Sequence, residues 1–389
     1  MMPSSRLVRY SIIALALLAV LPVLRFSAQK LSKAIESDPQ ISPPSLQIQR
    51  QAVQVVDDVL PDAELGYVLP PNLDQTIESI DFTSKRTTDS RGFPNPGPWP
   101  AQADMVFLGD SLLVGAGVGV SNGFVALLDA ALEDRTILNL GNPGAGPERQ
   151  LRIFQRYGVE VAPQLVVACL YLASDIEGDQ QFRAWLADAQ GMEYNRFRLS
   201  FARRQQARSG PDLMRHFEYN PLFLWLQSVV EPRLWGDSRF AHRLKMPDGN
   251  ELFFGRDKVR FARQAYSGDE KIFLEFLAPL ERLRELAATY GTTLAVVLIP
   301  SKEELFAVDP GSQSSGAAAI VRSQLRKLDI PVLDLYPILV ERAAETTPYF
   351  TSDIHLNSYG NQVVADALLQ WQEIRNLPTG SQSAVADIP

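Results

Sequence analysis

The feature that most constrains the fold of this chain is a regular alternation of short apolar segments with amphipathic helical periods, which begins at residue 104. The apolar segments are rich in β-branched residues, as buried strands are, and cover residues 105–108, 136–140, 164–171, 293–299 and 331–335. Helical periods lie between or after them, at residues 123–132, 148–157, 270–290, 317–328 and 358–371. Because strands that alternate with helices form a parallel sheet covered on both faces, we predict an α/β protein, a three-layer α/β/α sandwich with about five parallel strands.

The composition is that of a packed globular protein, with 46% hydrophobic and 21% charged residues. A formal net charge of −8 argues against the basic surface of a nucleic-acid binder, so we expect no nucleic-acid partner. The single cysteine, Cys169, lies in the apolar run 165–170. An intrachain disulfide is therefore excluded, and a buried thiol is expected.

The N-terminus indicates export. Residues 1–9 form a basic tail, and residues 10–24 are uncharged and apolar between Arg9 and Arg25. This run has the length of a signal-peptide core and is shorter than the ~20 residues of an ordinary spanning helix. No small-x-small cleavage site adjoins it. We therefore favour an uncleaved signal-anchor over a cleaved signal peptide, and expect the globular part at the cell membrane, outside the cytoplasm (periplasmic or extracellular).

The remaining segments are less regular. Residues 25–62 are polar and contain prolines, as a stalk would, and residues 63–103 are a proline-rich lead-in without helical period that we expect to be irregular. Residues 180–269 interrupt the alternation and read as a helical insertion with a turn at 247–250. The last residues, 376–389, have the composition of a disordered tail.

Two residues at strand or helix ends suggest nucleophilic catalysis. The strand at 105–108 runs directly into Gly109-Asp110-Ser111-Leu112, which presents Ser111 at the carboxyl edge of the sheet, where open α/β sheets bind ligands. A serine hydroxyl needs a base that is itself oriented by a third group. His355 lies in a loop before the last helix, two residues after Asp353, which can reach its Nδ1–H. The other two histidines, His216 and His242, lie in the insertion without such a context.

These blocks resemble those of the SGNH/GDSL hydrolase superfamily. The matching blocks are Gly109–Leu112 after the first strand, Asn139-Leu140-Gly141-Asn142-Pro143-Gly144 after the second, and Asp353-x-His355-Leu356-Asn357 before the last helix. A second Gly-Asp-Ser, at 236–238, follows no strand and receives no role. The resemblance implies a flavodoxin-like SGNH domain over residues 104–375 that acts on ester bonds, with Ser111, His355 and Asp353 as its catalytic triad.

The resemblance also implies an oxyanion hole with three donors. Two carry over, the backbone N–H groups of Ser111 and Gly144. The third family donor is an asparagine side chain in a Gly-x-Asn-Asp block, which here reads Leu172-Ala173-Ser174-Asp175. The Ser174 hydroxyl can donate one hydrogen bond but is shorter than an amide. A slow enzyme, another donor such as Asn142, and an inactive site therefore all stay open.

Several other patterns have ordinary interpretations. Glycines 115, 117 and 119 do not continue into a dinucleotide-binding Gly-x-Gly-x-x-Gly, because position 120 is valine, and no phosphate-binding or zinc motif occurs, so no cofactor or metal is expected. Asp175, Glu177 and Asp179 read as a solvated strand end. Lys302, after the fourth strand, is either a simple exposed lysine or holds an anionic group of the substrate.

Three functions remain open. The first is an esterase that acts on O-acyl, in particular O-acetyl, esters or on an acylated glycan. The second is an envelope polysaccharide O-acetyltransferase with the same triad, because the spacing Asp353-x-His355 resembles that of alginate O-acetylation proteins. The third is a non-catalytic SGNH-fold module that binds glycan or assembles a complex. The sequence leaves the acyl group, the alcohol and the oligomeric state undetermined.

Overall fold

The five apolar segments form a single parallel sheet with the strand order β11-β10-β7-β5-β6. Its strands are β5 (Met105–Leu108), β6 (Ile137–Asn139), β7 (Leu165–Leu170), β10 (Thr293–Leu298) and β11 (Val332–Asp334). Numbered among themselves along the chain, they have the order 2-1-3-4-5 of flavodoxin-like sheets. The predicted α/β fold is confirmed.

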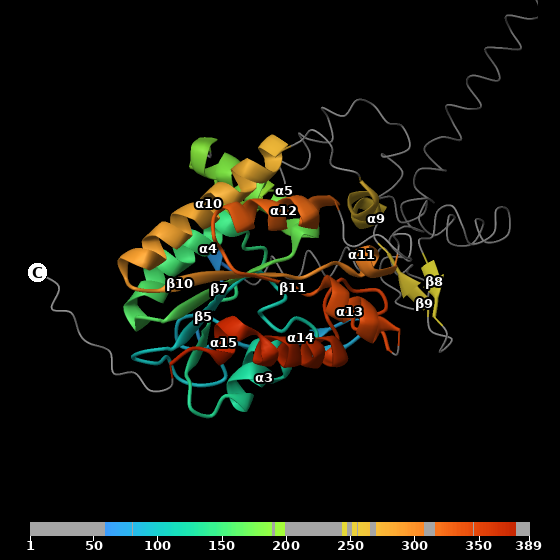
Figure 1. Cartoon of the computed structure of the whole chain (residues 1–389), viewed down its shortest axis with the longest axis horizontal. Helices are drawn as coiled ribbons and strands as arrows, with labels where there is room; N and C mark the ends of the chain where they lie inside the picture. The colour runs from blue at the N-terminus through green and yellow to red at the C-terminus, as the bar shows by residue number, and fades with distance from the viewer. Residues whose placement is uncertain are drawn as a thin grey trace, which may run out of the picture. The chain divides into compact units, whose positions relative to one another are not determined.

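Helices cover both faces of this sheet, as Figure 1 shows. One layer contains α4 (Pro147–Ile153), α5 (Leu172–Asp188), α10 (Glu270–Thr289) and α12 (Gly316–Lys327). The other contains α3 (Phe124–Ala131), α13 (Tyr336–Ala343), α14 (Ser358–Gln370) and α15 (Gln372–Arg375). Because side chains alternate along a strand, Val166 and Ala168 of β7 enter the first core whereas Val167 and Cys169 enter the second. Short 3-10 or π-helical turns complete the sandwich: η1 (Val120–Asn122), η2 (Phe154–Gly158) and η3 (Val159–Val161).

The computed structural model describes residues 59–79, 81–188, 191–198, 243–246, 251–254, 256–264, 270–306, 316–344 and 346–378, which lie in one compact unit. Several features singled out in the sequence fall outside these residues: the apolar segment 10–24, His216, His242, the second Gly-Asp-Ser, the turn at 247–250 and the tail from 379. Within the described ranges, no helix is both long enough and apolar enough to span a bilayer.

The lead-in is more regular than expected. Two antiparallel hairpins form here: β1 (Leu60–Asp62), at the end of the segment predicted as a stalk, pairs with β2 (Gly66–Val68), and β3 (Asp74–Glu78) pairs with β4 (Thr83–Thr87). In β3–β4 nearly every side chain is polar, so the apolar alternation that reveals a strand is missing from the sequence. An exposed ion pair between Lys85 and Asp74 joins the two strands at 3.0 Å.

The insertion begins inside a helix rather than after one, because α5 continues from β7 to Asp188. Its described remainder includes the helical residues 194–198, the hairpin β8 (Arg243–Lys245) with β9 (Glu251–Phe253), and helix α9 (Arg256–Arg263). Helix α9 contacts both α5 and α11 (Lys302–Phe306), the short helix after β10. The insertion therefore reaches the carboxyl edge of the sheet.

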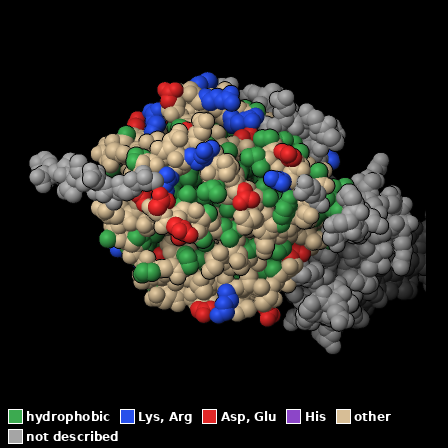
Figure 2. All heavy atoms as spheres, turned by 60° about the horizontal axis from the view of Figure 1, so that its bottom comes forward, with side chains coloured by type: hydrophobic (Ala, Val, Ile, Leu, Met, Phe, Trp, Pro, Cys, Tyr) green, Lys and Arg blue, Asp and Glu red, His purple; other side chains and the backbone are tan. Residues whose placement is uncertain are grey.

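The outer surface of the second layer carries a shallow groove between α13 and α14. Figure 2 looks at the molecule from this side, where apolar side chains mix with charged ones. The residues that line the groove are Leu333, Ile338, Arg342, Val363, Asp366, Ala367, Gln370, Trp371 and Gln372. It lies on the helical layer, away from the strand ends that carry Ser111.

Candidate active site

Ser111 lies at the carboxyl end of β5, beside the switch point between β5 and β7, from which the chain continues in opposite directions across the sheet. Such switch points are where open α/β sheets bind ligands. Two hydrogen bonds hold the turn that carries it: the Asp110 carboxylate accepts the backbone N–H of Leu112 at 2.9 Å, and the side chain of Asn139, the last residue of β6, donates to the carbonyl of Leu113 at 2.8 Å. Ser111 itself is partly exposed. A substrate can therefore reach its hydroxyl.

The structure brings together Ser111, His355 and Asp353, the three residues expected to form the triad. The Nε2 atom of His355 lies 2.8 Å from Ser111 Oγ, and its Nδ1 lies 2.5 Å from Asp353 Oδ1. Asn357 caps helix α14 by accepting the N–H of Gly360 at 2.9 Å, and it donates to the carbonyl of Thr347 at 2.8 Å. The loop that carries the histidine is thus tied to the helix that follows it. The two distances from the His355 ring, to Ser111 Oγ and to Asp353 Oδ1, are those that a serine nucleophile and its base require.

The electrostatics favour a protonated imidazole. Burial acts to lower the pKa of His355, but the charge and hydrogen bond of Asp353, together with the charge of Asp110, outweigh it and raise this pKa above 6.5. Burial likewise acts to raise the pKa of Asp353, and contact with His355 and the charge of Lys302 bring it below its ordinary value. Arg86 of β4 is close enough to oppose protonation of His355. The imidazolium that forms when Ser111 loses its proton is therefore stabilised by two carboxylates.

Two backbone N–H groups are available as oxyanion donors. Within the described part of the chain, neither the N–H of Ser111 nor that of Gly144 donates to a protein acceptor. Gly144 is exposed and has φ +66°, a left-handed conformation that favours glycine. The backbone N–H of Asn142 donates to the carbonyl of Gly109 at 3.0 Å, which holds the loop of Gly144 against the turn of Ser111.

The loop of Gly144 rests on a buried arginine and on a tyrosine from the lead-in. The carbonyl of Pro143 accepts from Tyr67 Oη at 2.7 Å and from Arg149 Nη1 at 3.0 Å. Arg149 also donates to Asn142 Oδ1 at 2.7 Å, and Asn142 Nδ2 faces the carbonyl of Tyr67 at 3.4 Å. The Asn142 oxygen and one of its two amide hydrogens are therefore directed at partners within the protein.

Ser174 lies in the first turn of α5, where its hydroxyl faces back toward the carbonyl of Tyr171 at 3.5 Å. Its neighbour Asp175 is buried on the helix and accepts the N–H of Tyr171 at 2.8 Å, so the interpretation of Asp175 as a solvated strand end is wrong. Burial raises the pKa of the Asp110 carboxyl, and burial together with the charge of Asp110 raises that of Asp175 well above its ordinary value. Lys258 of α9 donates to the carbonyl of Ala173 and adds a positive charge to this acidic region.

Lys302 is neither exposed nor open to a substrate, which corrects both sequence interpretations. Its side chain is fully buried, and its ammonium donates to the carbonyl oxygens of Asp353 at 2.8 Å, Thr351 at 3.1 Å and Phe350 at 3.4 Å. Burial lowers its pKa to about 8, against the charges of Glu303 and other carboxylates. The lysine therefore binds the backbone of the loop that carries the predicted triad acid.

Asp81, in the lead-in, was not identified from the sequence at all. Its carboxylate accepts the backbone N–H groups of Ser352 at 2.8 Å and Asp353 at 2.6 Å. The next residue, Phe82, packs on Phe350 with ring centroids 4.8 Å apart. No local pattern could have connected a residue at position 81 with a loop some 270 residues later.

The remaining candidates have structural roles. Glycines 115, 117 and 119 all have positive φ and form the turn between β5 and η1. Cys169 is buried and unpaired with another cysteine, as predicted, and burial raises the pKa of its thiol well above the usual value.

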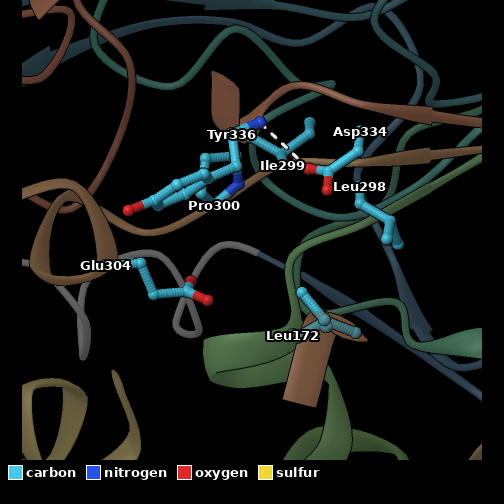
Figure 3. A pocket seen from close by; sticks show the side chains of 8 residues that line it. Leu172, Leu298, Ile299, Pro300, Glu304, Asp334 and Tyr336 are labelled. Atoms are coloured by element: carbon cyan, nitrogen blue, oxygen red, sulfur yellow. Dashed lines mark hydrogen bonds between the residues drawn. The ribbon is translucent and has the colours of Figure 1, made fainter. Parts of the chain in front are cut away.

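A small hollow lies at the same sheet edge, where β7, β10 and β11 end. Figure 3 shows its lining, with Asp334 turned toward the backbone N–H of Tyr336, a hydrogen bond of 3.0 Å. Arg322 also pairs with Asp334, at 2.5 Å. Ser111 and His355 do not line this hollow, so it is separate from the candidate catalytic residues.

Comparison with known proteins supports this interpretation of the sequence. Residues 253–386 match the family model described as SGNH hydrolase-like domain, acetyltransferase AlgX; this range contains Asp353 and His355 but not Ser111. No match was found among the curated proteins.

Similar solved structures include three with related titles. A member of the lipolytic protein G-D-S-L family from Veillonella parvula has 15% sequence identity and a TM-score of 0.35, and the match covers 69% of this chain and 97% of that chain. The acetyl xylan esterase AlAXEase has 12% identity and a TM-score of 0.35, and the match covers 68% of this chain and 97% of that chain. A variant of Axe2, an acetyl-xylooligosaccharide esterase from Geobacillus Stearmophilus, has 13% identity and a TM-score of 0.36, and the match covers 70% of this chain and 94% of that chain. Together with the family match, the five-stranded flavodoxin-like sheet confirms that this chain resembles the SGNH/GDSL hydrolase superfamily and has a similarity to AlgX.

Proposed function

We propose that this chain is a serine-dependent esterase acting on O-acyl, in particular O-acetyl, esters. The observation that carries the proposal is the continuous hydrogen-bonded series Ser111–His355–Asp353 at the switch point of the sheet. The roles of these residues follow from their chemistry, because a serine hydroxyl is activated when a neutral imidazole accepts its proton.

In acylation, Ser111 Oγ attacks the acyl carbonyl carbon while His355 Nε2 takes the hydroxyl proton. Asp353 holds the Nδ1–H and stabilises the imidazolium. The carbonyl oxygen, now negative, is bound by the N–H groups of Ser111 and Gly144. When the tetrahedral intermediate collapses, the bond to the alcohol oxygen breaks, and the alcohol leaves with the proton from His355.

Deacylation repeats these steps with water. His355 removes a proton from the water molecule, the resulting hydroxyl attacks the acyl-serine, and Ser111 recovers its proton as the acid departs. Acid–base catalysis of this kind contributes about 10²–10⁴-fold.

The second candidate is an O-acetyltransferase, in which a sugar hydroxyl replaces the water. The specific observation in its favour is the match of residues 253–386 to the AlgX family. The apolar segment 10–24, between Arg9 and Arg25, motivates a proposal on location: a single-pass anchor with the catalytic part outside the cytoplasm. Retention of the protein in membranes after a carbonate wash supports the anchor, and recovery of a soluble, N-terminally shortened form contradicts it.

The central experiment incubates the detergent-solubilised full chain with p-nitrophenyl esters of increasing acyl length, with and without an acceptor glycan. An esterase releases p-nitrophenol and free acid in both cases, fastest with acetate. A transferase moves the acyl group to the glycan, which mass spectrometry detects. A folded protein without Ser111-dependent turnover under either condition is the outcome expected of a non-catalytic module, and it refutes both enzymatic proposals.

A further inference from the structure

The loop 350–353 ends at the triad acid, and its backbone groups have few local partners. The loop is closed at its base by an isolated antiparallel bridge between Tyr349 and Leu356 and by the N–H of Phe350, which donates to the carbonyl of His355 at 3.1 Å. Residues 351–353 lie in the bends beyond this bridge, where neither a strand ladder nor a helical turn satisfies their N–H and C=O groups. Buried backbone groups that find no partner are costly, so the conformation of such a loop depends on whatever side chains bind it. Here most of those side chains come from distant parts of the chain.

Two oppositely charged side chains supply most of these partners. Lys302 binds three carbonyl oxygens of the loop, and Asp81 binds two of its N–H groups. A further hydrogen bond to the loop comes from the backbone N–H of Phe253 in β9, which donates to the carbonyl of Thr351 at 2.9 Å. The ammonium of Lys302 can only donate and therefore binds the carbonyl oxygens of this segment, and the carboxylate of Asp81 can only accept and therefore binds its N–H groups.

We propose that Asp81 and Lys302 are positioning residues of the triad, which together hold the loop 350–353 so that the Asp353 carboxylate faces His355. The proposal rests on the proposed function for the meaning of the triad, but it concerns residues that act through Asp353 and touch no substrate. The direct bond from Asp81 to the N–H of Asp353, and from Lys302 to its carbonyl, places one constraint on each side of the residue.

The choice of residues supports a role beyond packing. Lysine is almost never fully buried unless it is paired. Lys302 is fully buried, and the partners found for its ammonium are neutral backbone carbonyls, with Glu303, Asp353 and Asp81 as the carboxylates that act on its charge. An apolar residue of similar length would fill the same space without removing a charge from water. What it would not do is orient three carbonyl groups at once.

The geometric demand of the triad gives the expected effect. Asp353 Oδ1 accepts both the Nδ1–H and the backbone N–H of His355, at 2.5 Å and 2.8 Å. A displacement of about 1 Å at a reacting centre can cost roughly 10²-fold in rate. Lys302→Met and Asp81→Ala should therefore each lower kcat by about 10²-fold with KM changed less than about threefold.

Conservative variants separate a positioning role from general stability. Asp81→Asn keeps an acceptor oxygen and loses the charge, so it should retain more kcat than Asp81→Ala. The matched controls are Lys85→Met and Asp74→Ala, since this exposed ion pair lies on the same lead-in and carries the same charges. Both controls should behave as wild type.

Two readouts respond to triad geometry in particular. If Asp353 moves away from His355, the pKa of His355 falls, and the acid limb of kcat/KM shifts to lower pH. The far-downfield ¹H NMR resonance of the Nδ1 proton should be lost or displaced in Lys302→Met and Asp81→Ala and retained in the two controls. This resonance needs no substrate, so it tests the positioning role even if the ester substrates were chosen wrongly.

The outcomes are distinct. Loss of kcat together with a shifted acid limb and a changed resonance, in variants whose circular dichroism matches wild type, supports the proposal. Folded variants that keep wild-type kcat, acid limb and resonance overturn it. If either variant fails to fold, Asp81→Asn and the resonance decide: an unchanged signal there, with unchanged kcat, also overturns the proposal. A wild-type protein that shows the resonance but no Ser111-dependent turnover refutes the proposed function alone.

Discussion

Burial of the Lys302 ammonium should make the stability of this protein depend on pH in a way that a single substitution removes. The pKa of Lys302 is about 8 in the folded protein, against 10.5 for a free side chain. Each pKa unit corresponds to about 1.4 kcal/mol, so burial disfavours the charged form by about 3 kcal/mol. Between pH 8 and 10.5 the unfolded chain holds the proton and the folded protein does not, so the free energy of unfolding rises with pH over this interval.

The test compares wild type with Lys302→Met. The difference in their free energies of unfolding should change by up to about 3 kcal/mol in favour of wild type between pH 8 and 10.5, because the methionine variant has no proton to lose there. Contributions from tyrosines, which titrate in the same range, cancel in the difference. Urea unfolding followed by tryptophan fluorescence at several pH values measures it, with the exposed Lys85→Met as control. A difference that stays constant from pH 8 to 10.5 refutes the reasoning, since it would mean that the ammonium remains solvated.

Three further predictions concern the reaction. A fluorophosphonate should label Ser111, and both Ser111→Ala and His355→Ala should abolish labelling. Because the effects of residues in one catalytic unit are not additive, the activity of the double variant should be scarcely lower than that of either single variant, and labelling that persists in Ser111→Ala would show that Ser111 is not the nucleophile. His355 must be neutral to act as the base, and its pKa is raised above 6.5, so the acid limb of the pH profile of kcat/KM should have its midpoint above pH 6.5. Asp353→Asn should move this midpoint to lower pH, and a wild-type midpoint at or below pH 6.5 would contradict the raised pKa of His355. Ser174→Asn should raise kcat about tenfold with little effect on KM, because an amide reaches beyond the hydroxyl that now faces Tyr171; an unchanged kcat would show that position 174 does not face the oxyanion.

The sequence predicted the sheet closely because its strands are buried on both faces. The segment 105–108 was predicted to the residue, and helices α3, α10, α12 and α14 differ from their predicted ranges by at most one residue at either end. Helix α4 continues into a π-helical turn, and α11 and α13 were not predicted. Apolar runs bounded by turns carry this information locally. Helix α5 escaped detection because several of its buried positions are polar, among them Asp175, Asp179 and Gln181, so it lacks a clear apolar face.

The candidate site likewise contains residues that local sequence patterns reveal and residues that they do not. Ser111 and His355 could be paired from the sequence because each follows or precedes an element with a strong pattern. Both sequence interpretations of Lys302 were wrong, because nothing in the residues around it indicates that its side chain is buried. Asp81 could not be identified, because its role is set by a contact with backbone groups of 352 and 353, and a backbone group has the same chemistry whatever its side chain.

The lead-in hairpins have a consequence for where the functional unit of this protein begins. Tyr67 supports the loop of Gly144, and Asp81 binds the loop of Asp353, yet both precede residue 104, where the hydrolase-like pattern starts. A protein shortened to that pattern would keep every residue expected to react and lose two of the residues that orient them. Under the proposed function, substitutions between residues 60 and 90 should lower activity without changing Ser111, His355 or Asp353. The functional unit would then begin some forty residues before residue 104, where the hydrolase-like pattern starts.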